Sequence, residues 1–346
     1  MKNDGGQRRR TFDISVGIPA YGRSGELGEL LGSIYQQTLL PAEVTICEDA
    51  SSERERIRSI VSKWRKQFES EGCAVNYKEN ARNLGYDGNI RNVIGASRSQ
   101  WVMLIGNDDL LLKDCIEREE EFFRANAQIK LSSRTFVRFE KDIERPIGIS
   151  RLSARDEIYS LGASSPRMIF RSSGFVGGLV VNREWAQGIA TDRYDGTLYY
   201  QVYLAAMAFC EGGIGYIAHP TVGGRSGNPP LFGSAKSEKG VHVPGSFTPK
   251  GRAKMWASVL QITREVGEKH NVDLYTGTKG ELEVRQSFHV FEMMAGRDRS
   301  QLRELREELR NLDLFNHPIP RALYLVDWML GSRAKIFYAL VRKLMQ

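Results

Sequence analysis

The chain has 346 residues, of which 41% are hydrophobic and 26% charged, and this composition excludes a disordered or fibrous protein. A chain of this length forms one large domain or two smaller ones. The net charge of +7 favours an anionic partner, such as nucleic acid, a nucleotide phosphate or an anionic lipid, without choosing among them.

The spacing of the cysteines and the length of the apolar runs indicate in which cellular compartment the protein is expected. The four cysteines are widely scattered with no CxxC pair, which argues against a zinc site and indicates a reduced, cytosolic environment. No run of 18 apolar residues occurs, so a membrane-spanning helix is not expected. Residues 1–11 are polar and basic and precede no apolar signal core, and we predict a flexible arm there.

Strand and helix patterns alternate through the first third of the chain. A β-branched run at 13–19 ends in proline and predicts a strand, and an apolar stripe at helical spacing follows at Leu27, Leu30, Leu31 and Ile34. Further strands are predicted at 43–47, 73–78 and 101–105, each preceded by a loop or helix. This alternation predicts an α/β fold with a mostly parallel sheet flanked by helices.

The polar residues that follow these strands are expected to meet in one crevice. Segments 19–23, 48–52, 83–89 and 107–109 would all lie at the carboxyl edge of the sheet, where open α/β sheets bind ligands. Asp108 and Asp109 directly follow the buried run 101–105, and paired carboxylates there suit Mg²⁺ or Mn²⁺. The alternative is an ordinary polar turn, because Asn and Asp favour turns.

The remainder of the chain has weaker patterns. Helices are predicted at 113–126, 198–210, 252–270, 279–295 and 299–312, and strands at 130–140 and within the Gly-rich run 175–182. Residues 223–250 are rich in Gly, Ser, Pro and Lys, as in a mobile or ligand-shaped loop. We therefore divide the chain into an arm (1–11), a catalytic domain (12–222, with halves 12–115 and 116–222), the loop 223–250 and a helical region (251–346).

The last segment, 320–346, combines basic and apolar residues. The segment contains one acidic residue, Asp327, and five Lys or Arg residues, and its apolar side chains fall on one side of a helical wheel. This pattern is typical of a basic amphipathic helix lying on an anionic membrane surface. The alternative is a terminal helix packed on the protein's own core.

Several motifs together resemble the family 2 glycosyltransferases of the GT-A fold. They are Ser15-Val-Gly-Ile-Pro-Ala-Tyr-Gly-Arg23, Glu48-Asp49-Ala-Ser-Ser52, Asn83-Leu-Gly85 and Ile105-Gly-Asn-Asp-Asp109, in this order over residues 12–115. The last looks like the DXD metal motif of that family, with Asn107 in place of the first Asp. The pattern after Asn83 is similar to bacterial enzymes that build O-antigen and other surface polysaccharides.

The resemblance implies a role for each matching residue. The residues expected to bind the nucleotide sugar are Pro19, Tyr21, Arg23, Glu48, Asp49, Asn83, Gly85, Asp87 and Asp108. Asp109 would bind a divalent metal, Mn²⁺ or Mg²⁺, that bridges the two phosphates, and His242 could supply a further ligand, although a lone loop histidine is more often solvated. Arg225 is a similar candidate for contacting phosphate.

The family also implies an inverting mechanism, with a carboxylate that deprotonates the acceptor hydroxyl as a general base. Asp195 is our first choice for this base and Asp192 the second, and both could instead cap a helix.

These inferences predict a metal-dependent glycosyltransferase that acts at the cytoplasmic face of the cell membrane. It would transfer a sugar from a nucleotide-diphosphate donor to a lipid-linked or polysaccharide acceptor. The rival hypotheses are a protein that binds nucleotides or nucleic acid without transferase chemistry, and a nucleotidyltransferase. The basic residues are spread out and form no RNA motif with interleaved aromatics, so no nucleic-acid partner is expected. A nucleotidyltransferase is expected to have a Gly-rich phosphate-binding loop after the first strand, and the segment 19–23 does not have that sequence.

Overall fold

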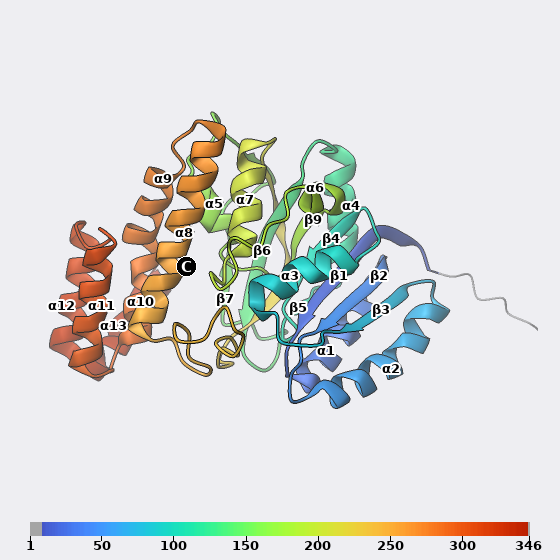
Figure 1. Cartoon of the computed structure of the whole chain (residues 1–346), viewed down its shortest axis with the longest axis horizontal. Helices are drawn as coiled ribbons and strands as arrows, with labels where there is room; N and C mark the ends of the chain where they lie inside the picture. Colours follow the sequence, from blue (N-terminus) through green and yellow to red (C-terminus); the bar gives the residue numbers. More distant parts are fainter. Residues whose placement is uncertain (1–8, 345–346) are drawn as a thin grey trace, which may run out of the picture.

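The computed structural model describes residues 9–344 and consists of a central sheet covered by helices on both faces (Figure 1). Residues 1–8 of the predicted arm and residues 345–346 lie outside the described part.

The first third of the chain alternates strands and helices, as predicted. Its elements are β1 (Thr11–Ala20), α1 (Ser24–Tyr35), β2 (Leu40–Glu48), α2 (Arg54–Ser70), β3 (Ala74–Glu79), α3 (Gly85–Ala96) and β4 (Trp101–Leu104). Strands β1 to β4 are parallel to their neighbours in the order β3-β2-β1-β4. Their carboxyl ends therefore lie at one edge of the sheet.

The second part completes the sheet with shorter and partly antiparallel strands. Its elements are β5 (Leu110–Leu111), α4 (Cys115–Ala125), β6 (Leu131–Phe139), β7 (Gly148–Ser150), β8 (Glu157–Tyr159), α5 (Arg167–Ser173), β9 (Leu179–Asn182), α6 (Arg183–Gly188), α7 (Tyr200–Cys210) and β10 (Ile214–Arg225). β9 runs antiparallel between β4 and β6, while β6 and β10 are parallel. The predicted α/β fold is confirmed, with a sheet that is parallel in its first half and mixed in its second.

β4 shows why the run 101–105 is apolar at every position. Successive strand residues point to opposite faces of a sheet. Val102 and Leu104 belong to the core beneath α3 and α7, whereas Trp101 and Met103 belong to the core beneath α1, α2 and α4. Because helices cover both faces, neither set of side chains reaches water.

Strand β10 was not predicted from the sequence. It extends to Arg225, so the expected boundary at 223 falls inside this strand, and the irregular loop comprises residues 226–248. The two expected halves, 12–115 and 116–222, contribute strands to one continuous sheet.

The C-terminal region is helical, as expected. It contains α8 (Pro249–His270), α9 (Tyr275–Gly280), a π-helical segment (Glu281–Gln286), α10 (Ser287–Met294), α11 (Arg299–Asn311), α12 (Pro318–Leu330) and α13 (Ala334–Leu344). These helices lie beside α7, on the side of the molecule away from α2 (Figure 1). Within residues 9–344 no helix has the length and apolar character needed to cross a bilayer.

The expectation of a single helix over 320–346 is wrong. A short 3-10 turn, Gly331–Arg333, separates α12 from α13, and Gly331 has a positive φ of 53° that ends the first helix. Tyr324 and Tyr338 are buried against the rest of the C-terminal region, so part of this segment packs on the protein's own core. The opposite sides expose Met329, which is 76% accessible, and Ile336, which is 63% accessible.

Candidate active site

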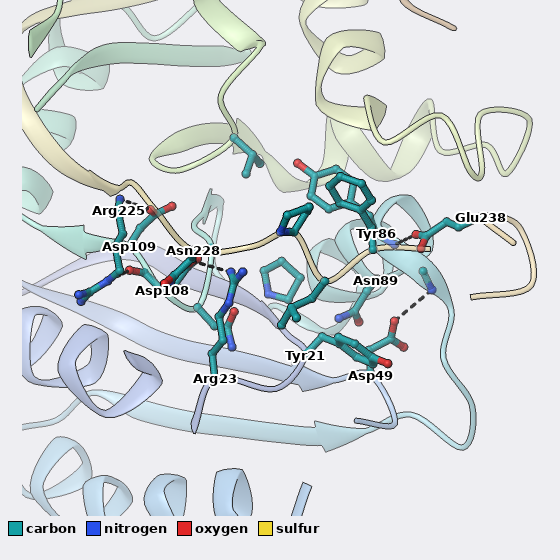
Figure 2. Close-up of a pocket in the computed structure, with 18 of the residues that line it drawn as sticks. Tyr21, Arg23, Asp49, Tyr86, Asn89, Asp108, Asp109, Arg225, Asn228 and Glu238 are labelled. Atoms are coloured by element: carbon teal, nitrogen blue, oxygen red, sulfur yellow. Dashed lines mark hydrogen bonds and ion pairs between the residues drawn. The ribbon is translucent and has the colours of Figure 1, made fainter. Parts of the chain in front are cut away.

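A cavity of about 320 Å³ opens at the carboxyl edge of the sheet. Nine of the residues singled out from the sequence line it: Pro19, Tyr21, Arg23, Asp49, Asn83, Gly85, Asp108, Asp109 and Arg225. All but Arg225, which ends β10, lie at the carboxyl ends of β1, β2, β3 and β4 or in the segments that follow them, which the parallel order brings together. Residues of the loop 226–248 form the remaining wall (Figure 2).

Two carboxylates and two arginines form one end of the cavity. Asp108 Oδ2 accepts hydrogen bonds from Arg23 at 2.5 Å and from Asn228 Nδ2 at 2.9 Å. Asp109 is 5% exposed, and its Oδ1 accepts a hydrogen bond from the Arg225 backbone N–H at 3.0 Å. Burial, reinforced by the charge of Asp108, raises the pKa of Asp109 well above its usual range.

The donor atoms at this end suit a divalent cation. Mg²⁺ and Mn²⁺ are held by one or two carboxylates and keep sites for water and substrate phosphates. Asp109 Oδ2 has space in front of it, because a Cβ atom at Gly177 would lie 2.7 Å from this oxygen and the glycine has none. Among residues 9–344 no cluster of three His, Cys, Asp or Glu occurs, so the cation would depend on Asp108, Asp109 and its substrate.

The other end of the cavity has aromatic and amide side chains around Asp49. The Asp49 carboxylate accepts hydrogen bonds from the backbone N–H groups of Leu84 at 2.8 Å and Gly85 at 3.0 Å, which fixes the loop before α3. Burial raises the pKa of Asp49. Tyr21 and Tyr86 line the same end, and their rings suit a planar ligand such as a nucleobase (Figure 2).

Glu238 is a residue of this cavity that the sequence reasoning missed. Its side chain is 2% exposed and accepts hydrogen bonds from the backbone N–H groups of Tyr86 at 2.7 Å and Gly233 at 2.6 Å. Gly85 has a φ of +80°, and a Cβ atom there would lie 2.7 Å from Glu238 Oε1. Glu238 therefore fastens the loop 226–248 to the start of α3 (Figure 2). The sequence contains one indication of this role, because Glu238 is the only acidic residue between residues 223 and 250.

Glu48 and Asp87 do not line the cavity, contrary to expectation. Glu48 is fully buried, accepts hydrogen bonds from the N–H groups of Ala50 and Ser51, and pairs with Arg54 at 2.6 Å. Asp87 lies in the first turn of α3 and is 1% exposed. Its oxygens accept hydrogen bonds from two backbone N–H groups at the start of α7, so both acids are used by the fold.

The residues expected as the general base also lie outside the cavity lining. Both carboxylate oxygens of Asp195 face the Arg91 guanidinium, with 2.9 Å between Oδ2 and Nη2. Asp192 is exposed on the preceding turn. In this conformation the Asp195 carboxylate is therefore occupied by its pair with Arg91.

His242 is not placed beside Asp109. It is 5% exposed, packs edge-on against the Phe232 ring and does not line the cavity, and its Nε2 has no hydrogen-bond partner. Burial lowers the pKa of His242. Arg225 does line the cavity, but its Nε donates to the backbone oxygen of Asp108 and its guanidinium pairs with Glu29.

Comparison with known proteins gives a match to a family model and to a curated protein. Residues 15–175 match the family model for Glycosyl transferase family 2. The abequosyltransferase RfbV of Salmonella typhimurium is 27% identical over 220 residues, which cover 60% of this chain and 65% of that protein. The match thus spans somewhat less than two thirds of the relative's length.

Solved structures share the fold at low sequence identity. S. aureus TarS 1-349, in complex with UDP-GlcNAc, superposes with a TM-score of 0.61 at 13% identity over 94% of this chain and 88% of the other. The mannosyltransferase PcManGT from Pyrobaculum calidifontis, in complex with GDP-Man and Mn²⁺, has a TM-score of 0.53 at 14% identity over 98% and 88% of the two chains. At this identity the likeness concerns the fold alone.

Proposed function

Because residues 15–175 match the family model for Glycosyl transferase family 2, we propose that this protein transfers a sugar from a nucleotide-diphosphate donor to a lipid-linked or polysaccharide acceptor. The observation that carries the proposal is the cavity at the carboxyl edge of the sheet. It combines an aromatic end around Asp49 with an acidic end at Asp108 and Asp109, as a nucleotide followed by a diphosphate requires.

The two solved structures named above are complexes with UDP-GlcNAc and with GDP-Man and Mn²⁺, which supports a nucleotide sugar as the donor. The relationship to an abequosyltransferase supports a role in the synthesis of a bacterial surface polysaccharide such as O-antigen.

A divalent cation held by Asp109, with Asp108 beside it, would neutralise the negative charge that develops on the diphosphate leaving group. The chain's own residues act around that position. Arg23 keeps Asp108 in place through its 2.5 Å contact, and the Arg225 backbone N–H does the same for Asp109. Glu238 holds the loop 226–248 over the aromatic end and so limits the access of water to the bound nucleotide.

We further propose inversion at the transferred carbon, which requires a base near the acceptor hydroxyl. Asp195, the residue expected for this role, could reach an acceptor in the cavity only after its pair with Arg91 opens. An Asp195→Asn variant tests the assignment. If Asp195 is the base, transfer falls by about a thousandfold or more while nucleotide binding is unchanged.

The exposed apolar residues of α12 and α13 support attachment to the cytoplasmic face of the cell membrane. Leu325 and Met329 are one helical turn apart on α12, and Ile336 and Leu340 are one turn apart on α13. Each pair forms an apolar stripe on its own helix, which suits insertion at a lipid interface.

Incubation with Mn²⁺ and a panel of UDP, GDP, CDP and dTDP sugars tests the proposed activity. We expect one donor to be hydrolysed or transferred, and Asp109→Ala to abolish turnover. Asp142→Ala serves as the matched control, because its side chain is 54% exposed and Asp142 does not line the cavity. The proposal is wrong if no donor binds or reacts, or if Asp109→Ala behaves like the parent.

A further inference from the structure

A second cavity, of about 300 Å³, lies between α5, α8 and α10. Its lining includes aromatic residues and an unusual number of basic ones: Phe175, Tyr199, Arg171, Arg252, Arg285 and His289. Within the described residues 9–344, no Asp or Glu lines it. This cavity is therefore electropositive, whereas the first contains four carboxylates.

The arginines of this second cavity have little compensating charge. Arg171 and Arg285 share one carboxylate, that of Glu281, at distances of 4.0 and 3.9 Å from their Nε atoms. Glu281 also accepts a hydrogen bond from Gln286 at 3.0 Å, which reduces what it offers to the two guanidinium groups. One acid at this range leaves a net positive charge between α5 and the π-helical segment.

The positive charge of Arg252 is compensated even less by nearby negative charge. Its guanidinium lies 4.3 Å from the centre of the Phe247 ring, donates a weak 3.6 Å bond to the sulfur of Met293 and lies beside the neutral Tyr199 hydroxyl, so no carboxylate pairs with it among residues 9–344. The Nε atoms of Arg171 and Arg252 are both buried without a hydrogen-bond partner. Burial lowers the pKa of each of these arginines, although a guanidinium remains charged at neutral pH. A buried guanidinium N–H group without an acceptor is costly, and a bound anion would offset that cost at both Nε atoms.

The two cavities adjoin through Phe175 and Phe247. Phe175 lines both. A Cβ atom at Gly177 would lie 2.7 Å from the Phe175 ring and equally close to Asp109 Oδ2, so this ring is next to the acidic end of the first cavity. Phe247 lines the first cavity and carries Arg252 of the second on its ring. A molecule in the second cavity could thus present another of its groups near Asp109.

We infer that the second cavity binds a phosphate or diphosphate group of the acceptor, with Arg171, Arg252 and Arg285 as its ligands. Several guanidinium groups around one site match the many oxygens of phosphate better than the two of a carboxylate. The aromatic and apolar lining would contact the carbon skeleton attached to the phosphate. The inference rests on the proposed function, because only a transferase needs an acceptor beside the donor. The phosphate group is held and takes no part in the bond that forms.

Titration of inorganic pyrophosphate into the full-length, EDTA-treated protein, followed by calorimetry, tests this site. The variants are Arg171→Gln and Arg285→Gln, and the matched control is Arg124→Gln, whose side chain is 71% exposed and remote from both cavities. The Arg285 side chain is 49% exposed, so its replacement leaves the core intact. Arg23→Gln reports on binding in the first cavity.

We expect Arg171→Gln and Arg285→Gln each to weaken pyrophosphate binding about tenfold or more, as the loss of one charge-assisted contact implies. Arg124→Gln and Arg23→Gln should bind within about twofold of the parent, within the scatter of such contacts. The inference is overturned if the parent does not bind pyrophosphate, if Arg171→Gln and Arg285→Gln bind it normally, or if Arg23→Gln abolishes binding.

A second titration with geranyl diphosphate identifies the source of the anion. Tighter binding than that of pyrophosphate would indicate a lipid diphosphate, and equal binding a phosphate within a glycan; both support the site. Because neither titration uses a sugar donor, the anion site and the proposed transferase activity can fail independently of each other.

Discussion

Replacing the buried Asp327 should change how the stability of the protein depends on pH. Asp327 lies in α12, is 5% exposed and lies beside the Tyr338 hydroxyl, but among residues 9–344 no well-formed hydrogen bond reaches either of its carboxylate oxygens. Burial raises the pKa of this carboxyl from 3.8 to about 7. The folded protein therefore keeps a proton that the unfolded chain has already lost between these two values.

The size of the effect follows from that difference in pKa. A raised carboxyl pKa contributes stability below pH 3.8, and this contribution is lost as the pH rises towards 7. Each pH unit in this window costs about 1.4 kcal/mol, so ionised Asp327 destabilises the fold by about 4 kcal/mol at pH 8. An Asp327→Asn variant has no such dependence. The free energy of unfolding of the variant should therefore gain about 3 kcal/mol on that of the parent between pH 5 and pH 8.

Urea denaturation at pH 5, 6, 7 and 8 measures this gain. The asparagine amide has a different hydrogen-bonding capacity beside Tyr338, but any cost of that kind does not depend on pH in this range and leaves the slope intact. Asp142→Asn, at an exposed position, is the control and should show no gain. A difference between parent and Asp327→Asn that stays constant across this range would refute the reasoning.

Three further predictions concern the cavity and the C-terminal helices. Because the pKa of Asp109 is raised, a cation that binds there must displace a proton, and Mn²⁺ affinity should increase with pH near neutrality. The Asp109→Asn variant should lose this pH dependence. Calorimetry in buffers of different ionisation enthalpy would detect the proton that is released. Glu238→Gln removes the acceptor from one of two buried N–H groups and should weaken nucleotide binding about tenfold or more. Equilibrium titration with a fluorescent nucleotide measures this loss. Wild-type affinity in the variant would mean that the position of the loop 226–248 does not depend on this contact. The double variant Met329→Asp and Ile336→Asp should no longer bind anionic vesicles in a flotation assay. Its melting temperature should stay unchanged, because both side chains are exposed. Vesicle binding by the double variant would argue against the membrane surface proposed for α12 and α13.

The cavity shows where sequence reasoning succeeded. Local patterns located β1 to β4 because each strand is either a compact apolar run or is followed by an amphipathic helix. A parallel arrangement of consecutive strands then requires the loops that follow them to share one edge. Asp49, Asp108 and Asp109 meet there for this reason, although they are up to 60 residues apart in the chain.

Acids of the same type in the same loops could not be sorted by sequence. Glu48 precedes Asp49 directly, yet its carboxylate turns back to Arg54, while Asp49 lines the cavity. Asp87 binds backbone groups of α7 more than 100 residues away, at Leu198 and Tyr200. Which acid binds a ligand and which stabilises the fold depends on partners that only the folded chain supplies.

The sequence by itself determined the α/β fold, the positions of the first four strands along the chain and the acidic pair at the edge of the sheet, because these features depend on apolar periodicity and on the rules of strand connection. The tertiary structure alone decided what surrounds that pair. Glu238 reaches Tyr86 across 152 residues, and Arg171 and Arg252 come together from helices 81 residues apart. Side chains brought together over such separations leave no periodic pattern in the chain, so the second cavity becomes visible only once the helices have packed.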